Sequence, residues 1–484
     1  MAETLKEKTA KGIFWGGLSN MVIQGLNLLL GIILARKLSA DDYGMVGVLL
    51  IFSNVAGAIQ ESGFTSALVN REKIRHEDYN AVFWFNLAMG AGLYLLLFLC
   101  APLIAAFFHQ PALTSLGRYS FLSVFFSSVG VAHNAMLIKR LRVKQNVMVQ
   151  MISLAVSGVV GVSMAYSGMA YWGLATQTLV YIVGVSAGRW VCSGWNPSLP
   201  VDFKPLRSMF GFSVKMLASN LVTQINNNIL TVIMGRYYHE REVGYYNQAN
   251  KWSYMGYNSL QGMINGVAQP VLRQVEDDEA RQLRVFRKML RFTAFVAMPC
   301  MFGLSLIAPE LIVIAITDKW SASASLMQVI CIGSAFLPIQ NLMYNLIVSK
   351  GRSDICLRVT IAYGVLQLAV GLICSRFGVR QMVCAYTVVN VLWVVVWWSF
   401  VRRLIRLGFW RTLSDIVPFC LVAAVSMLVA GAVASLLHGD WLVLTAKIVV
   451  AAACYVLSLY LLRAQVLREC ITQLKAILQK KRAG

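Results

Sequence analysis

SNMVIQGLNLLLGIILARKLSADDYG, residues 19–44, has a second copy two hundred residues later, SNLVTQINNNILTVIMGRYYHEREVG, residues 219–244. Each copy has a polar triplet, an apolar run, a basic residue and an acid two places before a glycine. A match of this length without a gap indicates an internal repeat, which has to be recognised before any local feature is interpreted. The matching pairs are Ser19/Ser219, Asn20/Asn220, Gln24/Gln224, Asn27/Asn227, Leu30/Leu230, Ile33/Ile233, Arg36/Arg236, Asp42/Glu242 and Gly44/Gly244.

Three amide side chains in each copy follow helical spacing. Asn20, Gln24 and Asn27 stand at i, i+4 and i+7, which places them on one face of a helix. Amides that face lipid leave donors and acceptors unpaired, so we expect the stripe to face either another helix or a wet cavity. The first alternative makes them interhelical hydrogen-bonding residues, whereas recurrence in both copies favours the second. The equivalent residues of the second copy are Asn220, Gln224 and Asn227.

The composition is typical of a membrane protein. Of the 484 residues, 58% are hydrophobic and only 13% are charged, and the mean hydropathy is +0.64. At about 20 residues per span, the apolar segments predict an all-α polytopic membrane protein with about fourteen transmembrane helices. The expected spans are 12–34, 45–69, 81–108, 117–138, 147–167, 171–190, 211–235, 247–271, 292–316, 323–349, 359–376, 381–401, 413–437 and 442–462.

Lysine and arginine are concentrated on one side of this predicted topology. About three-quarters of them fall on the side that carries both termini, which the positive-inside rule makes cytoplasmic. The asymmetry accounts for most of the formal net charge of +22, so nucleic-acid binding need not be invoked. Anionic membrane lipids are expected to interact with this surface.

The positions of the two copies predict the domain organisation. Because six spans separate them, the copies have the same orientation, which implies a pseudo-twofold axis along the membrane normal. We expect an N-terminal lobe of six spans at 1–192 and a cytoplasmic linker at 193–210, followed by a C-terminal lobe of six spans at 211–401. Two further spans at 402–462 precede a basic amphipathic tail at 463–484, expected on the inner leaflet.

Ionisable residues inside spans are costly and usually functional. Glu61 in span two is the candidate for ion coupling, because a partly buried carboxyl group can titrate near neutrality; the alternative is a structural salt bridge. Lys215 and Lys251 each lie four residues inside a span, where they either face a cavity or extend to a lipid headgroup. Arg36 and Arg236 end the two apolar runs, where each faces a cavity or pairs with the acid six residues on.

Enzyme chemistry has little support. The sequence contains no glycine-rich phosphate loop, nucleophile elbow or HExxH motif, and adjacent acids such as Asp41-Asp42 are alone a weak metal signal. We therefore expect a protein that moves something through a two-lobed bundle, not an enzyme. Three other ionisable residues are expected to be interfacial or packed, namely His133, Asp318 and Lys447.

Four stretches resemble a known family. They are KTAKGIFWGGLSN (8–20), ARKLSADDYGMVGV (35–48), ESGFTSALVNRE (61–72) and TDKWSASASLMQVI (317–330). With fourteen spans in two halves, the chain resembles the polysaccharide transporter branch of the multidrug/oligosaccharidyl-lipid/polysaccharide (MOP) exporter superfamily. These are the Wzx-like oligosaccharide flippases, in particular those of the colanic-acid and exopolysaccharide type.

The resemblance implies a bacterial inner-membrane protein that moves undecaprenyl-pyrophosphate-linked oligosaccharide from the cytoplasmic to the periplasmic leaflet, for exopolysaccharide or lipopolysaccharide synthesis. It implies two lobes around a cationic cavity, alternating access and no bound cofactor, with an H⁺ or Na⁺ gradient often invoked. Polysaccharide polymerase or export machinery is a further expected partner. The resemblance also implies that the amide stripes face sugar hydroxyls and that four basic residues face the pyrophosphate, namely Arg36, Lys215, Arg236 and Lys251.

Three rival functions stay open. A drug or cation antiporter of the same superfamily would favour an acidic, aromatic-lined cavity. A lipid II flippase would share nearly every feature described above. A membrane glycosyltransferase or polysaccharide polymerase would need a sizeable catalytic loop, which this sequence lacks.

Overall fold

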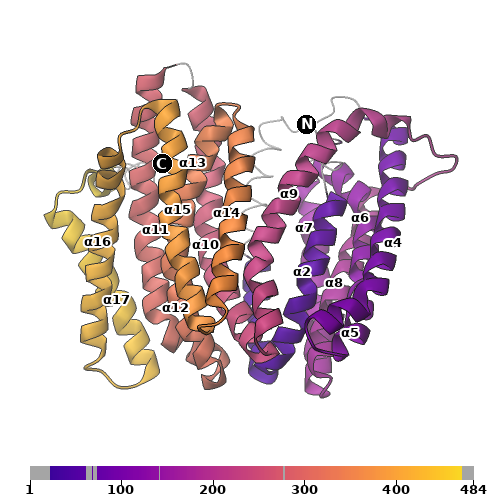
Figure 1. Ribbon diagram of the computed structural model, residues 1–484, viewed down its shortest axis with the longest axis horizontal. Helices are drawn as coiled ribbons and strands as arrows, with labels where there is room; N and C mark the ends of the chain where they lie inside the picture. Colours follow the sequence, from indigo (N-terminus) through magenta and orange to yellow (C-terminus); the bar gives the residue numbers. More distant parts are fainter. Residues whose placement is uncertain are drawn as a thin grey trace, which may run out of the picture. The chain divides into compact units, whose positions relative to one another are not determined.

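The computed structural model describes residues 22–61, 68, 74–140, 142–275, 278–470 and 472, and these residues contain helices and no strand (Figure 1). Side chains are described in these ranges except at 61, 205, 207–216, 219, 263–267, 269, 270 and 273. The predicted all-α class is confirmed.

The described part of each of the fourteen expected spans is helical, apart from turns inside or at the ends of some spans. The described part of the first is a helix at 22–37, and spans four and ten each consist of two helices, α5 with α6 and α12 with α13. The helices are α2 (Ala40–Glu61), α4 (His76–Phe107), α5 (Ala112–Ser120), α6 (Leu122–Lys139), α7 (Val143–Tyr166), α8 (Ala170–Ser193), α9 (Lys204–Tyr237), α10 (Glu240–Gln274), α11 (Glu279–Ile316), α12 (Ser321–Ser334), α13 (Leu337–Ser349), α14 (Ser353–Cys374), α15 (Val379–Ile405), α16 (Phe409–Ala434) and α17 (Asp440–Leu461), with a 3₁₀ turn η1 (Asp318–Trp320).

Within the described residues, ten helical segments are long and apolar enough to cross a membrane. The long helices α9 and α10, of 34 and 35 residues, are not among them. Both are polar for membrane helices, because α9 carries the second amide stripe and α10 continues with further amides and tyrosines. Such helices need a wet or protein-lined environment at membrane depth.

The chain divides into two compact units, Met1–Gly244 and Tyr245–Gly484. In the first unit α8 packs against α6 and α7, and α2 packs against α9. In the second unit α11 packs against α12, α16 and α17. The lobe boundaries predicted from the sequence depend on helix count and stay a prediction; α9, expected to open the second lobe, packs against α2 and α4.

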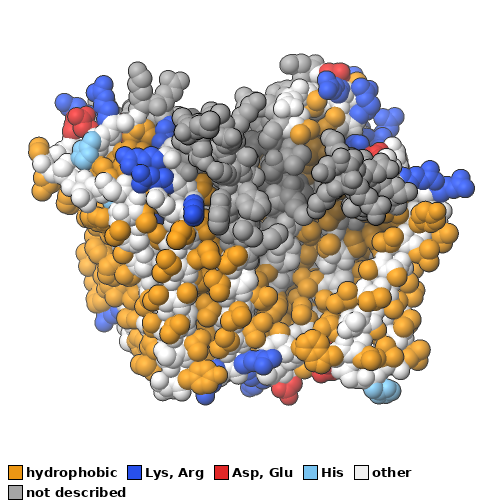
Figure 2. Space-filling model, turned by 180° about the vertical axis from the view of Figure 1, so that it is seen from behind, with side chains coloured by type: hydrophobic (Ala, Val, Ile, Leu, Met, Phe, Trp, Pro, Cys, Tyr) orange, Lys and Arg blue, Asp and Glu red, His pale blue; other side chains and the backbone are white. Residues whose placement is uncertain are grey.

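Apolar side chains cover the faces that a bilayer would contact. Figure 2 shows hydrophobic side chains over the broad middle of the surface, with Lys and Arg gathered mainly along its upper edge and a few along the lower one. Leu103 on α4, Val159 on α7 and Leu428 on α16 are each at least 70% exposed. Large exposed apolar side chains of this kind identify a multi-pass membrane protein.

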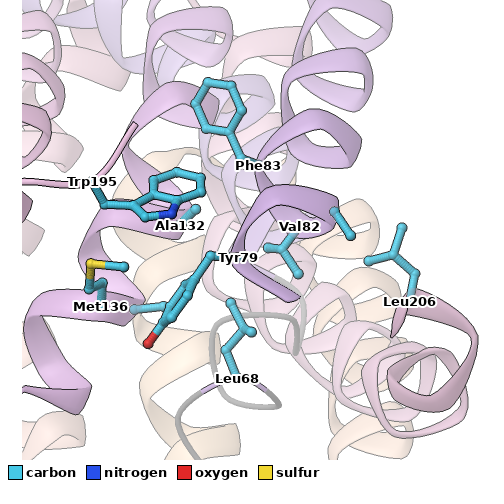
Figure 3. Close-up of a cluster of buried hydrophobic side chains, with 10 residues drawn as sticks. Leu68, Tyr79, Val82, Phe83, Ala132, Met136, Trp195 and Leu206 are labelled. Atoms are coloured by element: carbon cyan, nitrogen blue, oxygen red, sulfur yellow. The ribbon is translucent and has the colours of Figure 1, made fainter. Parts of the chain in front are cut away.

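A buried aromatic cluster ties the segment after α8 to the start of α4. Trp195 lies against Tyr79 and Phe83 (Figure 3). Asn80 binds the backbone of Ser198 in both directions, accepting from its N–H at 2.9 Å and donating to its carbonyl at 2.8 Å. The first part of the expected linker is therefore packed against the first unit, and α9 begins at Lys204 within the rest of it.

His133, expected to be packed or interfacial, is fully buried in α6. Its Nδ1 lies 2.8 Å from the hydroxyl of Ser193, and its ring centroid lies 4.7 Å from that of Trp190. The prediction of a packed role is confirmed.

Candidate functional site

The two amide stripes show matching exposure wherever the structure describes both. Gln24 on helix 22–37 and Gln224 on α9 are half-buried, while Asn27 and Asn227 are exposed. Asn20 lies outside the described residues, and its counterpart Asn220 is half-buried. The two copies of the repeat therefore present equivalent amides to similar degrees.

The opposite side of α9 carries a further amide that the spacing analysis passed over. Asn226 is 9% exposed, whereas its neighbour Asn228 is half-buried and donates to the carbonyl of Gln224 at 2.8 Å. The run of three asparagines at 226–228 therefore divides between a packed residue and more exposed ones. This run of three asparagines was the sequence signal that could have revealed Asn226.

Arg236 lies one residue before the end of α9. One guanidinium nitrogen lies 2.7 Å from Nδ1 and 2.8 Å from Nε2 of His109, and the guanidinium carbon lies 5.2 Å from the centre of the Phe107 ring. In the part of the chain that the structure describes, no carboxylate pairs with Arg236. The alternative pairing with Glu242 is not made, since Oε2 of that residue is buried without a partner.

The other predicted site residues are either exposed or have side chains outside the described set. Lys251 is exposed on α10, and Arg36 is exposed at the end of helix 22–37. Lys215 lies in α9 and Glu61 ends α2, but both side chains fall outside the described set. The structure therefore brings Arg236 together with His109 and Phe107, which the sequence did not predict.

Asp42, the alternative partner of Arg36, caps the start of α2. Its Oδ2 accepts from the N–H of Ser39 at 2.9 Å and from the Ser39 hydroxyl at 2.7 Å, while the Asp42 N–H points back to that hydroxyl at 3.2 Å. This is a reciprocal capping arrangement, in which the polar groups of a helix start satisfy one another. It explains the acid of the first copy without any substrate.

Two other groups of charged residues in or next to the expected spans form ion pairs. Lys447 on α17 binds Glu310 on α11 at 2.7 Å, with the two side chains 12% and 16% exposed. Asp415 on α16 is 2% exposed and pairs with Arg287 at 2.7 Å and with Arg291 at 3.0 Å. The packed role expected for Lys447 is confirmed. The signal missed was an acid within each of the expected spans nine and thirteen.

A polar cavity of about 210 Å³ lies inside the first unit, among α2, α6 and α8. Gln60, Ser127, Asn134, Tyr181 and Arg189 contribute to its lining. Gln60 donates to the carbonyl of Val124 at 2.6 Å, and the Ser127 hydroxyl donates to the Gln60 side chain. The cavity is roomy and polar enough to hold ordered water.

The glycines that end the two repeat copies lie in direct backbone contact with the opposite copy. A methyl group on Gly44 would stand 1.9 Å from the carbonyl oxygen of Glu240, and one on Gly244 would stand 1.8 Å from that of Ala40. These separations are far below van der Waals contact, so no other residue fits without a backbone shift. The repeat found in the sequence is therefore a pair of mutually packed segments.

Comparison with known proteins defines the class first. The fold is similar to that of the lipid II flippase MurJ in an inward closed conformation, with a TM-score of 0.74, 14% identity, and 93% of this chain and 98% of that chain covered. It is also similar to an inward-facing multidrug resistance MATE transporter of the MOP superfamily, with a TM-score of 0.66, 16% identity, and 79% and 94% covered. This chain therefore shares its fold with both of these transporters.

The sequence comparisons identify the family. A family model described as polysaccharide biosynthesis protein matches residues 33–325, which is more than half of the chain. The lipopolysaccharide biosynthesis protein WzxC of Escherichia coli (strain K12) is 24% identical over 360 residues, covering 73% of this chain and 72% of that protein. The teichuronic acid biosynthesis protein TuaB of Bacillus subtilis (strain 168) is 22% identical over 470 residues, covering 94% and 96%. This chain belongs to the polysaccharide biosynthesis protein family.

Proposed function

We propose that this protein is a flippase that moves undecaprenyl-pyrophosphate-linked oligosaccharide repeat units from the cytoplasmic to the periplasmic leaflet by alternating access. The bacterial inner membrane, with both termini cytoplasmic, is the proposed location. An oligosaccharide cannot cross hydrocarbon, so the protein has to offer a polar path while the prenyl chain stays in lipid. We expect the amide and tyrosine side chains of α9 and α10 to contribute to this path.

One observation carries the proposal: the described cations in or next to the expected spans divide into two classes. Lys447, Arg287 and Arg291 are neutralised by buried carboxylates, whereas Arg236 and Lys251 have no acidic partner among the described residues. A cation held without a counter-charge in or near the membrane is costly unless it faces water or an anionic ligand. A pyrophosphate is such a ligand, and arginine binds it through a bidentate fork.

The amide stripes fit the sugar part of the same substrate. Sugars present many hydroxyls, and an amide offers both donors and acceptors to them. The exposure of Asn27 and Asn227 supports the cavity interpretation over dry interhelical bonding. Ion coupling is assigned by this proposal to Glu61, with an H⁺ or Na⁺ gradient as the energy source.

The two acids inside expected spans whose side chains the structure describes weigh against the cation-antiporter alternative. Glu310 and Asp415 lie within expected spans, and both are already paired with lysine or arginine. A cationic drug would need a carboxylate free to receive it. Lipid II as the substrate remains a rival that differs from the proposal in the glycan, so the two must be separated by substrate choice.

The test is flipping in proteoliposomes made with the full chain and a fluorescent lipid-linked oligosaccharide. The double variant Arg236→Gln/Lys251→Gln is expected to lower the flipping rate at least tenfold at unchanged protein level, because the charge-assisted contact to the pyrophosphate is lost whichever of the two residues makes it. Arg380→Gln, which removes an exposed cation outside the proposed site, is the matched control and should flip normally.

Three results would overturn the proposal. Flipping by the double variant at the wild-type rate would reduce both residues to lipid anchors. Transport of cationic dyes without any flipping of the oligosaccharide would assign the protein to the antiporters. Faster flipping of lipid II than of lipid-linked oligosaccharides would assign it to the lipid II flippases.

A further inference from the structure

A deep apolar groove opens on the first unit between α2, α4 and α9. It has a volume of about 620 Å³, within the range of about 300–1,000 Å³ that is usual for ligand sites. Every lining residue is apolar, and they include Val55, Leu96, Leu103, Phe107 and Val232. Leu96 and Leu103 are 57% and 70% exposed, so the groove is open to its surroundings.

The groove is long as well as deep. Its lining on α4 runs from Leu93 to Phe107, which at 1.5 Å per residue is about 20 Å along the helix axis. The hydrocarbon core of a bilayer is about 30 Å thick. A groove of about 20 Å is therefore longer than one leaflet of that core.

A cation stands at one end of this groove. Phe107 lines the groove, and the guanidinium of Arg236 lies 5.2 Å from the centre of the same ring. Val232 on α9 lies in the lining, one helical turn before Arg236. The only hydrogen-bond partner given to that guanidinium by the described residues is the imidazole of His109, which leaves its positive charge uncompensated.

An apolar trough with a fixed cation at one end is complementary to a single-chain anionic amphiphile. Ordinary phospholipids cover any exposed apolar face. Because they have two chains, they match a single groove that ends in one arginine less well. A linear prenyl chain that ends in a phosphate matches both the shape and the charge. The end that carries Arg236 is the one that the charge distribution of the loops places outside.

We propose that this groove binds the polyprenyl chain of the lipid carrier in the outer leaflet, with the carrier phosphate at Arg236. This inference rests on the proposed function and adds a site for the part of the substrate that never leaves the membrane. The groove contacts no sugar, so it selects the carrier whatever glycan is attached. The amides of the polar path would then select the glycan separately.

The test uses the purified full chain in nanodiscs of phosphatidylethanolamine and phosphatidylglycerol, with a polyprenyl phosphate that carries a photoreactive diazirine in its chain. Crosslinks are expected on residues 93–107 of α4 and 51–59 of α2. Unlabelled polyprenyl phosphate should compete fully, whereas extra phosphatidylglycerol should not. Polyprenol, which lacks the phosphate, should compete at least tenfold less well, because the contact to arginine is lost.

Two variants and one control sharpen the result. Leu96→Trp fills the groove and should lower crosslinking about tenfold, and Leu103→Trp serves the same purpose if the first variant folds poorly. Arg236→Gln should make polyprenyl phosphate and polyprenol equal competitors. Val159→Trp adds the same bulk to a 71% exposed position on α7, outside the groove, and should change nothing.

Crosslinks spread over all exposed apolar faces, or full competition by phosphatidylglycerol, would overturn the inference and leave ordinary lipid in the groove. The proposed function is judged separately, by flipping. A wild-type protein that flips oligosaccharide but gives no groove crosslink refutes the groove alone. A protein that gives the groove crosslink but never flips refutes the proposed function, and the groove stands as a carrier-binding site.

Discussion

Asn226 and Asn227 are neighbours on α9 with opposite surroundings, since the first is 9% exposed and the second is open. Asn227→Leu is expected to leave thermal stability in detergent unchanged and to slow flipping, because only a substrate contact is lost. Asn226→Leu should lower stability by about 1 kcal/mol, the value typical of a lost interhelical hydrogen bond. Melting curves and flipping rates measured on the same preparations separate the two effects. Loss of stability in Asn227→Leu with normal activity per folded molecule would favour the interhelical interpretation of the stripe.

Lys447 and Glu310 form a pair whose removal should cost stability and not substrate binding. Lys447→Gln leaves the Glu310 carboxylate buried without a charge partner, so we expect a loss of about 3 kcal/mol. The double variant Lys447→Met/Glu310→Gln removes both charges together and should be much less destabilised. Thermal unfolding followed by tryptophan fluorescence gives both values. Equal losses in the single and double variants would show that the pair contributes nothing beyond side-chain packing.

The residues of the candidate site were predictable from the sequence to different degrees. Arg236 and the amide stripe could be found because they stand at fixed spacing in a repeated segment. His109 could not be connected to Arg236, because 127 residues separate them and the contact depends on the turn after α4. The turn brings His109 into the left-handed region, with φ of 58°, which no local pattern specified.

The contact between the two repeat copies gives a prediction at the scale of helices. Gly44→Ala or Gly244→Ala places a methyl group within 2 Å of a carbonyl oxygen, so the start of α2 has to separate from the start of α10. Overpacking of this kind costs about 1–3 kcal/mol. Spin labels at positions 37 and 238 should report a longer distance in both variants. Gly57→Ala on the same helix α2, where a methyl group would meet no atom within 4 Å, should leave the distance unchanged.

The first turn of the tail is held to α11 by a pair that responds to pH. The hydrogen bond from Lys288 holds the pKa of Glu469 below its ordinary value, and the two groups lie 2.6 Å apart. A carboxylate with a lowered pKa contributes its contact above that pKa and loses it as the pH falls through it. The contact should therefore persist from neutral pH down through the ordinary carboxyl pKa of 4.5 and be lost only in stronger acid. Spin labels at 284 and 472 measure it, and Glu469→Gln should abolish the pH dependence.

Helices were the most predictable part of the fold, because a run of apolar residues long enough to span a bilayer has almost no alternative structure. The break inside span four was not predicted, whereas Pro338 indicated a kink near the one inside span ten. Phe121 separates α5 from α6, and Ala335-Phe336 separates α12 from α13 just before Pro338. These residues are as apolar as their neighbours, so hydropathy continues across each break. The contacts of the first part of the linker with α4 could not be predicted for another reason. They join residues more than a hundred positions apart in the sequence, such as Asn80 with the segment that contains Trp195.

At the scale of the whole molecule, the topology is testable by chemical labelling. On a background without the ten native cysteines, single cysteines in the loop at 167–170 should react with a membrane-impermeant maleimide added to whole spheroplasts. Single cysteines at 139–144 should react only after the membrane is opened, because the positive-inside rule places that basic loop in the cytoplasm. Reaction of the 139–144 loop in intact spheroplasts would reverse the orientation.

The ion pairs that hold α16 and α17 to α11 set an order of assembly during synthesis. Glu310 and Lys447 are separated by 137 residues, and at about 5–20 residues per second the ribosome needs on the order of ten seconds to make the stretch between them. During that interval the carboxyl group of Glu310 is already in α11 but its partner has not been synthesised. Arg287 and Arg291 are likewise synthesised before their partner Asp415. In a chain that stops before Phe409, both sets of charges would stay unpaired permanently. The last two helices therefore complete the second unit. We expect the shortened protein to be degraded by membrane proteases.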